Sequence, residues 1–336
     1  MNIRKFLKDP KYVAGNYIFK RRPNLLPDRW YIEIMYKKIF GHKIDLRHPK
    51  TFNEKLQWLK LYDRNPLYTT LVDKYRVKQY VADKIGAEYV IPTLAVYNSV
   101  DEIDLDKLPN QFVLKCNHDS GSVAICRDKK TFDLEAAKKK LDKGLKQNFY
   151  LLAREWPYKN VKRCIIAEQY MEDHGGGFAD MQPNESDLQL DESLQLVENN
   201  RVMKISGEGE NPDGEIYFDN MALVDYKFFC FHGEPKVMYI GADKAKEPTS
   251  DFFDMEYNHL PIRMVDPNAE QIPPKPKEFE KLKELATILS KGIPHVRIDF
   301  YVVNGKIYFG EFTFYHMGGF SLVKPHEWNL KMGQWI

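Results

Sequence analysis

The sequence predicts an α+β protein in which antiparallel strand hairpins pack against helices. Amphipathic segments of helical character fill the first part of the chain. Apolar strands joined by short turns follow, and the last turn is the pair Asn304-Gly305, which favours a tight hairpin. No internal repeat is visible. No GxGxxG, Walker A or GxSxG element occurs, which argues against Rossmann, P-loop and serine-hydrolase interpretations.

The helices expected near the start of the chain follow from amphipathic spacing and capping residues. Residues 28–40 are amphipathic. Residues 51–61 begin with Thr51 and have Glu54 three positions later, the pattern of a capping box. A third helix is expected over 69–85, ending at Gly86. Further along the chain, helices are expected over 134–152 and 278–291.

The expected strands are short apolar runs bounded by turn residues. They cover 111–116, 123–126, 164–171, 222–231, 235–241 and the two arms of the final hairpin within 295–320. The first two predict a hairpin around a loop that contains Ser and Gly. Residues 173–221 are acidic and rich in Gly, Asn and Asp, which indicates a long insertion or lid.

Composition places the chain among soluble globular proteins, with 43% apolar and 29% charged residues in 336. No run of about 18 apolar residues exists, so no transmembrane helix is expected. The N-terminus lacks the pattern of a signal peptide. The four cysteines have no CxxC spacing, so reduced, buried thiols in a cytoplasmic protein are expected rather than disulfides or a zinc site.

The net charge of +2 hides two segments of opposite sign. Residues 1–60 hold fifteen Lys or Arg against five Asp or Glu, and residues 172–220 hold two against thirteen. The basic segment suits an anionic membrane face or an anionic polymer, although a solvated helical surface is the simpler interpretation. No nucleic-acid motif accompanies the charge, so no nucleic-acid partner is expected.

Charged residues in the final hairpin are the strongest functional signal. Arg297 and Asp299 share one face of the first strand, and Glu311 and Thr313 share one face of the second. The turn can bring the two faces together, and converging carboxylates are the hard oxygen ligands that Mg²⁺ bound to phosphate requires. Exposed hairpin charges are the alternative, but the flanking apolar residues predict a mostly buried hairpin, where charges need partners.

Two lysines interrupt apolar strands elsewhere. Lys115 precedes the Ser/Gly loop, whose backbone N–H groups and hydroxyls are suited to phosphates. Lys227 stands among aromatic residues. Each is also explained as an edge-strand lysine that reaches water. Together with the paired carboxylates, the two lysines favour a site for phosphate and magnesium.

Residues 168–171 are a candidate hinge for a purine base, because Glu168 ends a strand and backbone groups follow it. An exposed strand-end glutamate is the alternative interpretation. The histidines are not spaced as a metal-binding set. Among them, His118 beside the Ser/Gly loop is the best candidate for contact with substrate or phosphate, while His316 is expected to be a loop or supporting residue.

These motifs, in this order, resemble the ATP-grasp superfamily: DK at 73–74, FVLK at 112–115, the Ser/Gly loop, EQYM at 168–171, Lys227, RID at 297–299 and EFT at 311–313. More narrowly, residues 45–325 without the acidic insertion resemble the TupA-like ATP-grasp family, which is associated with teichuronopeptide and other bacterial surface-polysaccharide synthesis. The resemblance implies two antiparallel α+β lobes that clasp ATP. It divides the chain into a helical region over 1–68, a first lobe over 69–166 and a second lobe over 167–336.

The resemblance also implies roles for particular residues. Positions matching those that hold nucleotide phosphates are Lys74, Lys115 and Lys227, with Ser120, Gly121 and Ser122 in the loop that closes over them. Positions matching the adenine-facing hinge are Glu168, Gln169, Tyr170 and Met171, with Glu172 or Asp173 near the ribose. Asp299 and Glu311 match Mg²⁺ ligands, and Arg297 matches the arginine that steadies the transferred phosphoryl group. Thr313 stands where the superfamily usually has Asn, and a hydroxyl is a weaker metal ligand.

The activity implied by the resemblance is that of an ATP-dependent carboxylate–amine ligase, which forms an amide through an acyl phosphate. An amino acid or amine would be joined to a small-molecule or lipid-linked sugar acid in capsule or cell-wall assembly, in the cytoplasm or at the inner face of the membrane. Glycan-assembly proteins are further expected partners of the basic N-terminal region. A sugar or carboxylate kinase and a non-catalytic nucleotide-binding assembly protein are the alternatives. The helical front of the chain differs from the α/β domain that many ATP-grasp ligases have there.

Overall fold

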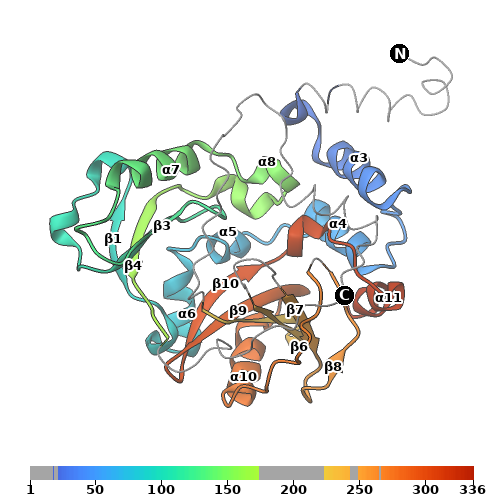
Figure 1. Cartoon of the computed structure of the whole chain (residues 1–336). Coiled ribbons are helices and arrows are strands. Elements are labelled where there is room, and N and C mark those ends of the chain that lie inside the picture. The colour runs from blue at the N-terminus through green and yellow to red at the C-terminus, as the bar shows by residue number, and fades with distance from the viewer. Residues whose placement is uncertain (1–17, 19–21, 174–222, 243–248, 265) are drawn as a thin grey trace.

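The computed structural model describes residue 18 and residues 22–173, 223–242, 249–264 and 266–336. Within these residues, two antiparallel sheets form two lobes with helices packed around them (Figure 1). The expected α+β class is therefore confirmed. Nearly all of the expected insertion at 173–221 lies outside the described residues, as do residues 1–17 and 19–21 of the basic segment.

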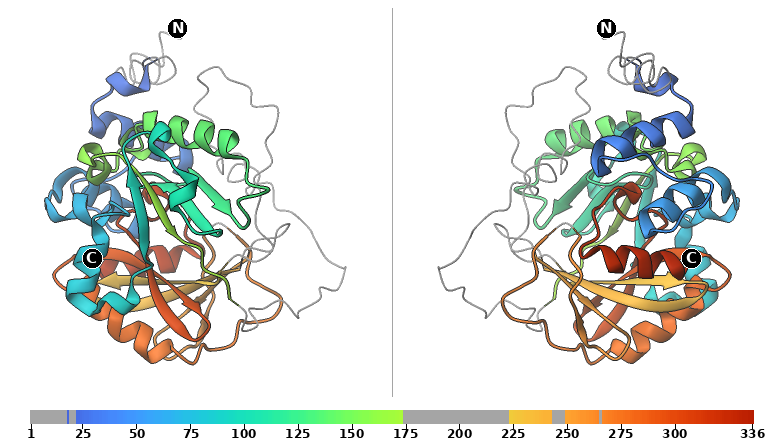
Figure 2. Two further views of the ribbon diagram at one scale, coloured as in Figure 1. Left: turned by 90° about the vertical axis from the view of Figure 1, so that its left-hand side faces the viewer. Right: turned by 90° about the vertical axis from the view of Figure 1, so that its right-hand side faces the viewer.

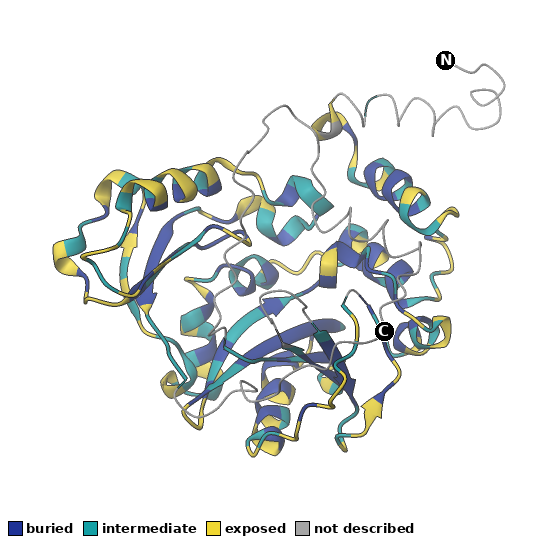
Figure 3. Ribbon diagram, viewed as in Figure 1, coloured by how far each residue is buried: buried dark blue, intermediate teal, exposed yellow. Residues whose placement is uncertain are grey.

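The first lobe is built on a sheet with strand order β1-β4-β2-β3. Helix α7 (Leu134–Lys146) covers one face of it, and Figure 3 shows that the outer side of this helix is exposed. Leu114 and Ala167 are buried on the side of the sheet that faces α7. Because side chains alternate along a strand, Lys115 and Glu168 project from the opposite face. The strands are β1 (Thr93–Tyr97), β2 (Phe112–Cys116), β3 (Val123–Cys126) and β4 (Ile165–Gln169).

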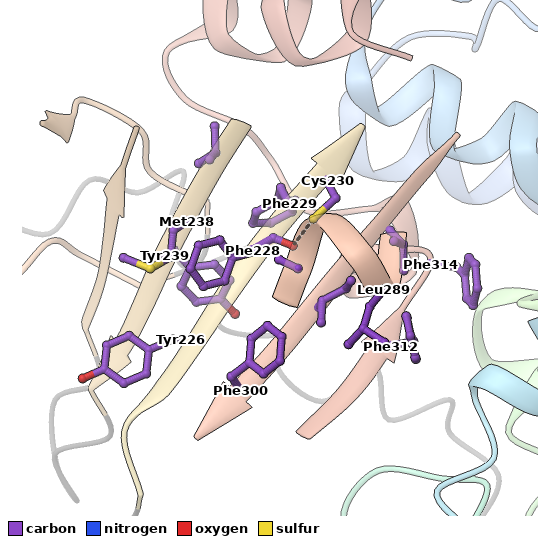
Figure 4. Close-up of a cluster of buried hydrophobic side chains, with 14 of the residues drawn as sticks. Tyr226, Phe228, Phe229, Cys230, Met238, Tyr239, Leu289, Phe300, Phe312 and Phe314 are labelled. Atoms are coloured by element: carbon purple, nitrogen blue, oxygen red, sulfur yellow. Dashed lines mark hydrogen bonds between the residues drawn. The ribbon is translucent and has the colours of Figure 1, made fainter. Parts of the chain in front are cut away.

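The second lobe has a sheet of order β10-β9-β5-β6-β7-β8, with helix α10 (Phe279–Ser290) against β5, β6 and β9. Its apolar face holds a large aromatic core (Figure 4). Strand pairing sets Phe228 opposite Ile298 in that core and Lys227 opposite Asp299 on the other face. The strands are β5 (Asp225–Phe231), β6 (Glu234–Ala242), β7 (Thr249–Phe253), β8 (His259–Leu260), β9 (His295–Val303) and β10 (Lys306–Thr313).

The helices before the first strand pack largely on the second lobe. Buried residues of α4 and α6, such as Phe52 and Val81, belong to the same core cluster as Phe228 and Phe312. Helix α4 lies against α11, and α6 lies against α10, and Figure 2 shows this arrangement from two sides. These helices are α3 (Asp28–Phe40), α4 (Phe52–Tyr62), α5 (Leu67–Leu71) and α6 (Val77–Ile85), with α11 (His326–Gln334) at the C-terminus.

The prediction of a capping box at the start of α4 is confirmed. The Thr51 hydroxyl accepts a hydrogen bond from the Glu54 backbone N–H at 3.2 Å, and Glu54 accepts one from the Thr51 N–H at 3.0 Å. The four cysteines are free and buried, as expected. Strands β7 and β8 and helix α11 were not predicted.

Two of the helix predictions are wrong in length. The helix expected over 69–85 is divided into α5 and α6 by a turn at 72–76. The helix expected over 134–152 ends at Lys146, because Gln147 takes an extended conformation and its carbonyl group accepts a hydrogen bond from His118 at 3.2 Å. A separate short helix, α8 (Tyr150–Ala153), follows it.

Candidate functional site

Arg297 and Asp299 form a fork on one face of β9. Arg297 Nε and Nη2 donate to the two carboxylate oxygens of Asp299, each at 2.7 Å, and both residues are buried. From the neighbouring strand β5, Lys227 Nζ lies 3.1 Å from Asp299 Oδ2 and 2.7 Å from Asp225. Burial alone would lower the pKa of Lys227, but attraction to Asp299 and Asp225 outweighs it and raises the pKa. The lysine is therefore a permanent cation.

Strand β10 brings its two expected residues to the same place. The register sets Glu311 opposite Asp299 and Thr313 opposite Arg297, after a bulge at Gly310. Glu311 Oε1 lies 3.3 Å from Arg297 Nη2 and accepts a hydrogen bond from the Thr313 hydroxyl at 3.3 Å. The Glu311 side chain is 40% exposed, so a ligand can reach it. Burial would raise its pKa, but Lys74 and other nearby cations lower it.

His316 completes the surroundings of Arg297. Its Nδ1 accepts a hydrogen bond from Arg297 Nη1 at 2.6 Å, because an arginine is always a donor. Burial and the positive charge of Arg297 hold the pKa of His316 well below its usual value. The ring is therefore neutral and supports Arg297, which agrees with the supporting role expected from the sequence.

Lys115 of the first lobe and Lys78 of helix α6 share one carboxylate, that of Glu168. Lys115 Nζ lies 2.5 Å from Glu168 Oε2, and Lys78 Nζ lies 2.6 Å from Glu168 Oε1. Glu168 is only 4% exposed. Burial would raise its pKa, but Lys115 and Lys78 lower it below the usual value. The interpretation of Glu168 as an exposed residue at a strand end is therefore wrong, because it lies within β4 between two cations.

Lys74 links the two lobes from the turn between α5 and α6. Its backbone N–H donates to Asn117 O at 2.9 Å, its ammonium donates to Asp119 O at 2.6 Å, and the same ammonium lies 3.7 Å from Glu311 Oε2. Buried Asp73 fixes the turn by accepting hydrogen bonds from backbone N–H groups at 75 and 76 and from the Asn117 side chain at 2.9 Å. These contacts explain why the expected helix is interrupted here.

A small pocket between the lobes brings most of these groups together. Lys74, Lys78 and Lys115 line this pocket together with the carboxylate of Glu311, and apolar side chains close one side. Its lining residues are Lys74, Val77, Lys78, Val90, Ile91, Lys115, Glu168, Tyr301, Phe309, Gly310 and Glu311. The pocket therefore combines three cations, two carboxylates and an apolar wall.

The Ser/Gly loop divides into an exposed tip and a buried base. Ser120 and Gly121 are exposed, and Gly121 has a φ of +100°. Ser122 is buried and donates its hydroxyl to Asp119 at 2.5 Å, so this hydroxyl is already used. His118 is also buried, against Gln147, and is not positioned for the substrate contact considered for it.

The remaining hinge residues follow strand β4. Gln169 is its last residue and is exposed, and its backbone N–H donates to Pro92 O at 3.0 Å. The Tyr170 hydroxyl accepts a hydrogen bond from Arg127 at 3.1 Å. Met171 is partly buried, and Glu172 and Asp173 contact Asn304 on the second lobe, each at 3.0 Å. The end of the expected hinge segment, at residues 172–173, is therefore hydrogen-bonded to the turn of the final hairpin.

Sequence reasoning missed Lys78, Asp225 and Tyr301. Lys78 was visible as the residue four positions after Lys74, and Asp225 as the residue two positions before Lys227 on the same strand face. Negative charge on Asp225, together with burial, raises the pKa of Tyr301 well above its usual value. Its hydroxyl therefore remains a neutral donor at the edge of the pocket.

Asp299 and Glu311 are the candidate magnesium ligands, and an ion there would share the Asp299 carboxylate with Arg297, which already donates to both of its oxygens. Asp299 and Glu311 face each other across two strands, and the Thr313 hydroxyl lies beside Glu311. Among the described residues, no group of three or more His, Cys, Asp or Glu side chains is arranged to hold a metal alone. Such a set suits Mg²⁺, which is usually bound by one or two carboxylates plus substrate phosphates.

Comparison with known proteins gives one extensive match. The family model described as TupA-like ATPgrasp matches residues 54–183 and 213–336. A search of curated proteins found no match.

Several solved structures share a distant likeness. D-alanine–D-alanine ligase from Helicobacter pylori has 13% identity and a TM-score of 0.40, over 85% of this chain and 67% of that one. The ATP-bound ligase of the same name from Bacillus anthracis has 12% identity and a TM-score of 0.34, over 73% and 53%. The ATP-grasp ligase PsnB with a minimal precursor has 7% identity and a TM-score of 0.37, over 77% and 59%. The chain thus spans little more than half the length of two of these proteins, and likenesses this remote say nothing about its activity.

Proposed function

Since the chain belongs to the TupA-like ATP-grasp family, we propose that it is an ATP-dependent ligase that joins a carboxylate to an amine. The observation that carries the proposal is the pocket between the lobes. It brings Lys115 of the first lobe, together with Lys74 and Lys78, close to Glu311 of the final hairpin. Proteins of the ATP-grasp class bind ATP, generally with Mg²⁺.

ATP would bind with its phosphates on Lys74, Lys78 and Lys115. Lys115 and Lys78 already hold one anion, the Glu168 carboxylate, and Lys74 reaches the cleft from the turn at 72–76. The exposed tip of the Ser/Gly loop lies next to Lys74 through Asp119 and offers backbone N–H groups. Apolar Val77, Ile91 and Phe309 would cover the base.

Asp299, Glu311 and Thr313 would hold Mg²⁺, which when bound supplies charge neutralisation to the phosphates. Arg297 and Lys227 on the same face would stabilise negative charge on the phosphates through their own positive charges. Arg297 and Lys227 are cations whose positions are fixed by Asp299, so they need little reorganisation when negative charge develops nearby.

The proposed chemistry needs positioning and charge rather than a protein nucleophile. An oxygen of the substrate carboxylate forms a bond to the γ-phosphorus of ATP while the bond to the β-bridging oxygen breaks, which gives an acyl phosphate and ADP. The amine nitrogen then attacks the acyl carbon, inorganic phosphate leaves, and the nitrogen loses a proton to give the amide. Closure over the site would keep water from the acyl phosphate.

The proposed substrates follow from the family resemblance. A sugar acid, free or lipid-linked, would be the carboxylate and an amino acid or other amine would be the acceptor, in bacterial surface-polysaccharide assembly in the cytoplasm. The basic N-terminal segment would bring the enzyme to the membrane or to glycan-assembly proteins. No helix among the described residues has the length and apolar character to cross a membrane.

The test is an amine-dependence assay with a panel of sugar acids and amines, and with ADP and inorganic phosphate measured separately. A ligase releases both products in equal amounts only when carboxylate and amine are both present, and hydroxylamine added in place of the amine traps the acyl phosphate as a hydroxamate. A stable phosphorylated product without phosphate release would indicate a kinase instead. Binding of Mg-ATP without ADP formation across the panel would indicate a nucleotide-binding assembly protein.

A further inference from the structure

We propose that helix α4 positions Arg297 through the loop at 315–321, with Asn53, Gln57 and Lys60 as its positioning residues. These three side chains occupy positions i, i+4 and i+7, so they lie on one stripe of the helix. Each is at most 1% exposed. The inference rests on the proposed function, because it assumes that Arg297 acts on the transferred phosphoryl group.

All three side chains donate to backbone carbonyl groups of the loop. Asn53 Nδ2 donates to Ser321 O at 2.8 Å and to Gly319 O at 3.1 Å. Gln57 Nε2 donates to Gly319 O at 2.9 Å and to Gly318 O at 3.1 Å. Asn53 and Gln57, one turn of the helix apart, thus bind neighbouring carbonyl groups of the loop, which packing alone would not require.

Lys60 extends the stripe by one more contact. Its ammonium donates to Gly318 O at 2.7 Å and to Ala153 O at 2.6 Å, and it lies 4.5 Å from the centre of the Phe320 ring. Burying a lysine without a carboxylate in direct contact is costly, so a purely apolar side chain would serve packing better. Its two bonds tie the loop to the C-terminal end of helix α8.

The loop needs this support because its backbone is unfavourable. Met317, Gly318 and Gly319 have φ values of +49°, +61° and +71°, and Met317 is a non-glycine residue in the left-handed region. A Cβ atom on Gly319 would lie 2.7 Å from Gln57 Nε2, so the loop and the helix are in close contact. Hydrogen bonds from α4 therefore select one conformation of this segment.

The loop carries His316, and His316 holds Arg297 from the side opposite Asp299. Its ring packs edge-on against Phe229 and Tyr239 of the sheet, at 5.3 and 5.8 Å between ring centres, while its backbone belongs to the loop, so its position depends on both. Arg297 Nη1 donates to His316 Nδ1 at 2.6 Å. A displacement of the loop that moves His316 would therefore also move the guanidinium. A chain of direct contacts thus connects a helix outside both sheets with the reacting centre.

The test compares binding of Mg-AMPPNP and Mg-ADP by isothermal titration, because the two nucleotides differ in the group that Arg297 is proposed to meet. Lys60→Met keeps the aliphatic stem and removes both hydrogen bonds. We expect it to weaken AMPPNP binding about tenfold, the effect of one disturbed charge-assisted hydrogen bond, and to leave ADP binding unchanged. Lys55→Met on the same helix is the control and should change neither. Gln57→Met is the milder second variant if Lys60→Met does not fold.

A double variant tests the connection itself. If Lys60 acts through Arg297, Lys60→Met combined with Arg297→Lys should bind AMPPNP no more weakly than Arg297→Lys alone. A further loss in the double variant, or an equal loss for ADP and AMPPNP in Lys60→Met, would overturn the positioning role. Wild-type protein that binds neither nucleotide would overturn the proposed function, and this inference with it.

Discussion

Lys115 on β2 lies 2.5 Å from Glu168 on β4, and the same carboxylate holds Lys78 at 2.6 Å. The pocket therefore contains its own anion in the absence of a nucleotide. A phosphate that enters must share these lysines with Glu168. Substitution of either lysine therefore tests the nucleotide site directly.

Lys115→Met should weaken ATP binding by about 10- to 100-fold, because it removes a charged donor to phosphate while it keeps the aliphatic stem. Titration calorimetry at fixed ionic strength measures the change. The matched control is Lys130→Met, on the exposed surface of the same lobe. Unchanged ATP affinity in Lys115→Met would exclude a phosphate role for this residue.

Glu311→Gln should abolish turnover while the protein stays folded, because its side chain is 40% exposed and the amide keeps its shape. Asp299→Asn should also abolish turnover, but with a loss of about 3 kcal/mol in the free energy of unfolding, since it leaves buried Arg297 without a full counter-charge. Coupled ADP assays and urea unfolding measure the two effects. Normal activity in either variant would remove that carboxylate from the metal site.

Substitutions at Thr313 should change the Mg²⁺ concentration that the enzyme requires. Thr313→Val removes the hydroxyl with little change in volume, and we expect the Mg²⁺ concentration for half-maximal activity to rise about tenfold. Thr313→Asn, which restores the residue that the superfamily usually has, should lower that concentration below the wild-type value. Titration of activity with MgCl₂ at saturating ATP distinguishes the variants. The same half-saturation in all three proteins would show that position 313 does not contact the ion.

Stability should fall in mild acid because of His295. Burial lowers its pKa to about 3, so the folded protein keeps this ring neutral where the unfolded chain, with an ordinary pKa, binds a proton. The folded pKa is depressed, so stability is lost as pH falls below about 6.5, and the loss continues towards pH 3. At pH 5.5 the loss from His295 is about 1 kcal/mol relative to neutral pH. His316 acts in the same direction.

Urea unfolding at pH 7.5 and pH 5.5 measures this dependence, with His295→Gln as the comparison. The variant should be less stable than wild type at pH 7.5, because it disturbs the ring packing of Phe52, but its stability should change less between the two pH values. An equal change in both proteins would show that another group is responsible.

Features that depend on local sequence could be predicted. The Asn304-Gly305 turn and the apolar strands around it predicted the final hairpin, while the pairing of Glu311 with Asp299 depends on the bulge at Gly310, which was not predicted. The capping box of α4 was equally local, because Thr51 and Glu54 satisfy each other.

Features that depend on distant partners could not be predicted. The break at 72–76 requires Asn117, more than forty residues away, to bind Asp73. The burial of Glu168 depends on Lys78, which a helix brings alongside strand β4. In α4, the polar residues Gln57 and Lys60 are buried because the 315–321 loop returns over them and supplies carbonyl groups, a contact that the local sequence does not indicate.

The bulge at Gly310 decides on which side of β10 the acidic residues lie. The apolar side chains of this strand occupy odd positions before it, Ile307 and Phe309, and even positions after it, Phe312 and Phe314. A strictly alternating strand would have put Glu311 and Thr313 on the same side as Phe309, inside the aromatic core. One extra residue therefore reverses the phase of the strand at the point where it reaches Asp299. A Cβ atom on Gly310 would lie 3.1 Å from Asp299 O, a tight contact that the neighbouring strand would have to relieve. The residue that sets the phase of β10 is therefore also held close to the backbone of β9.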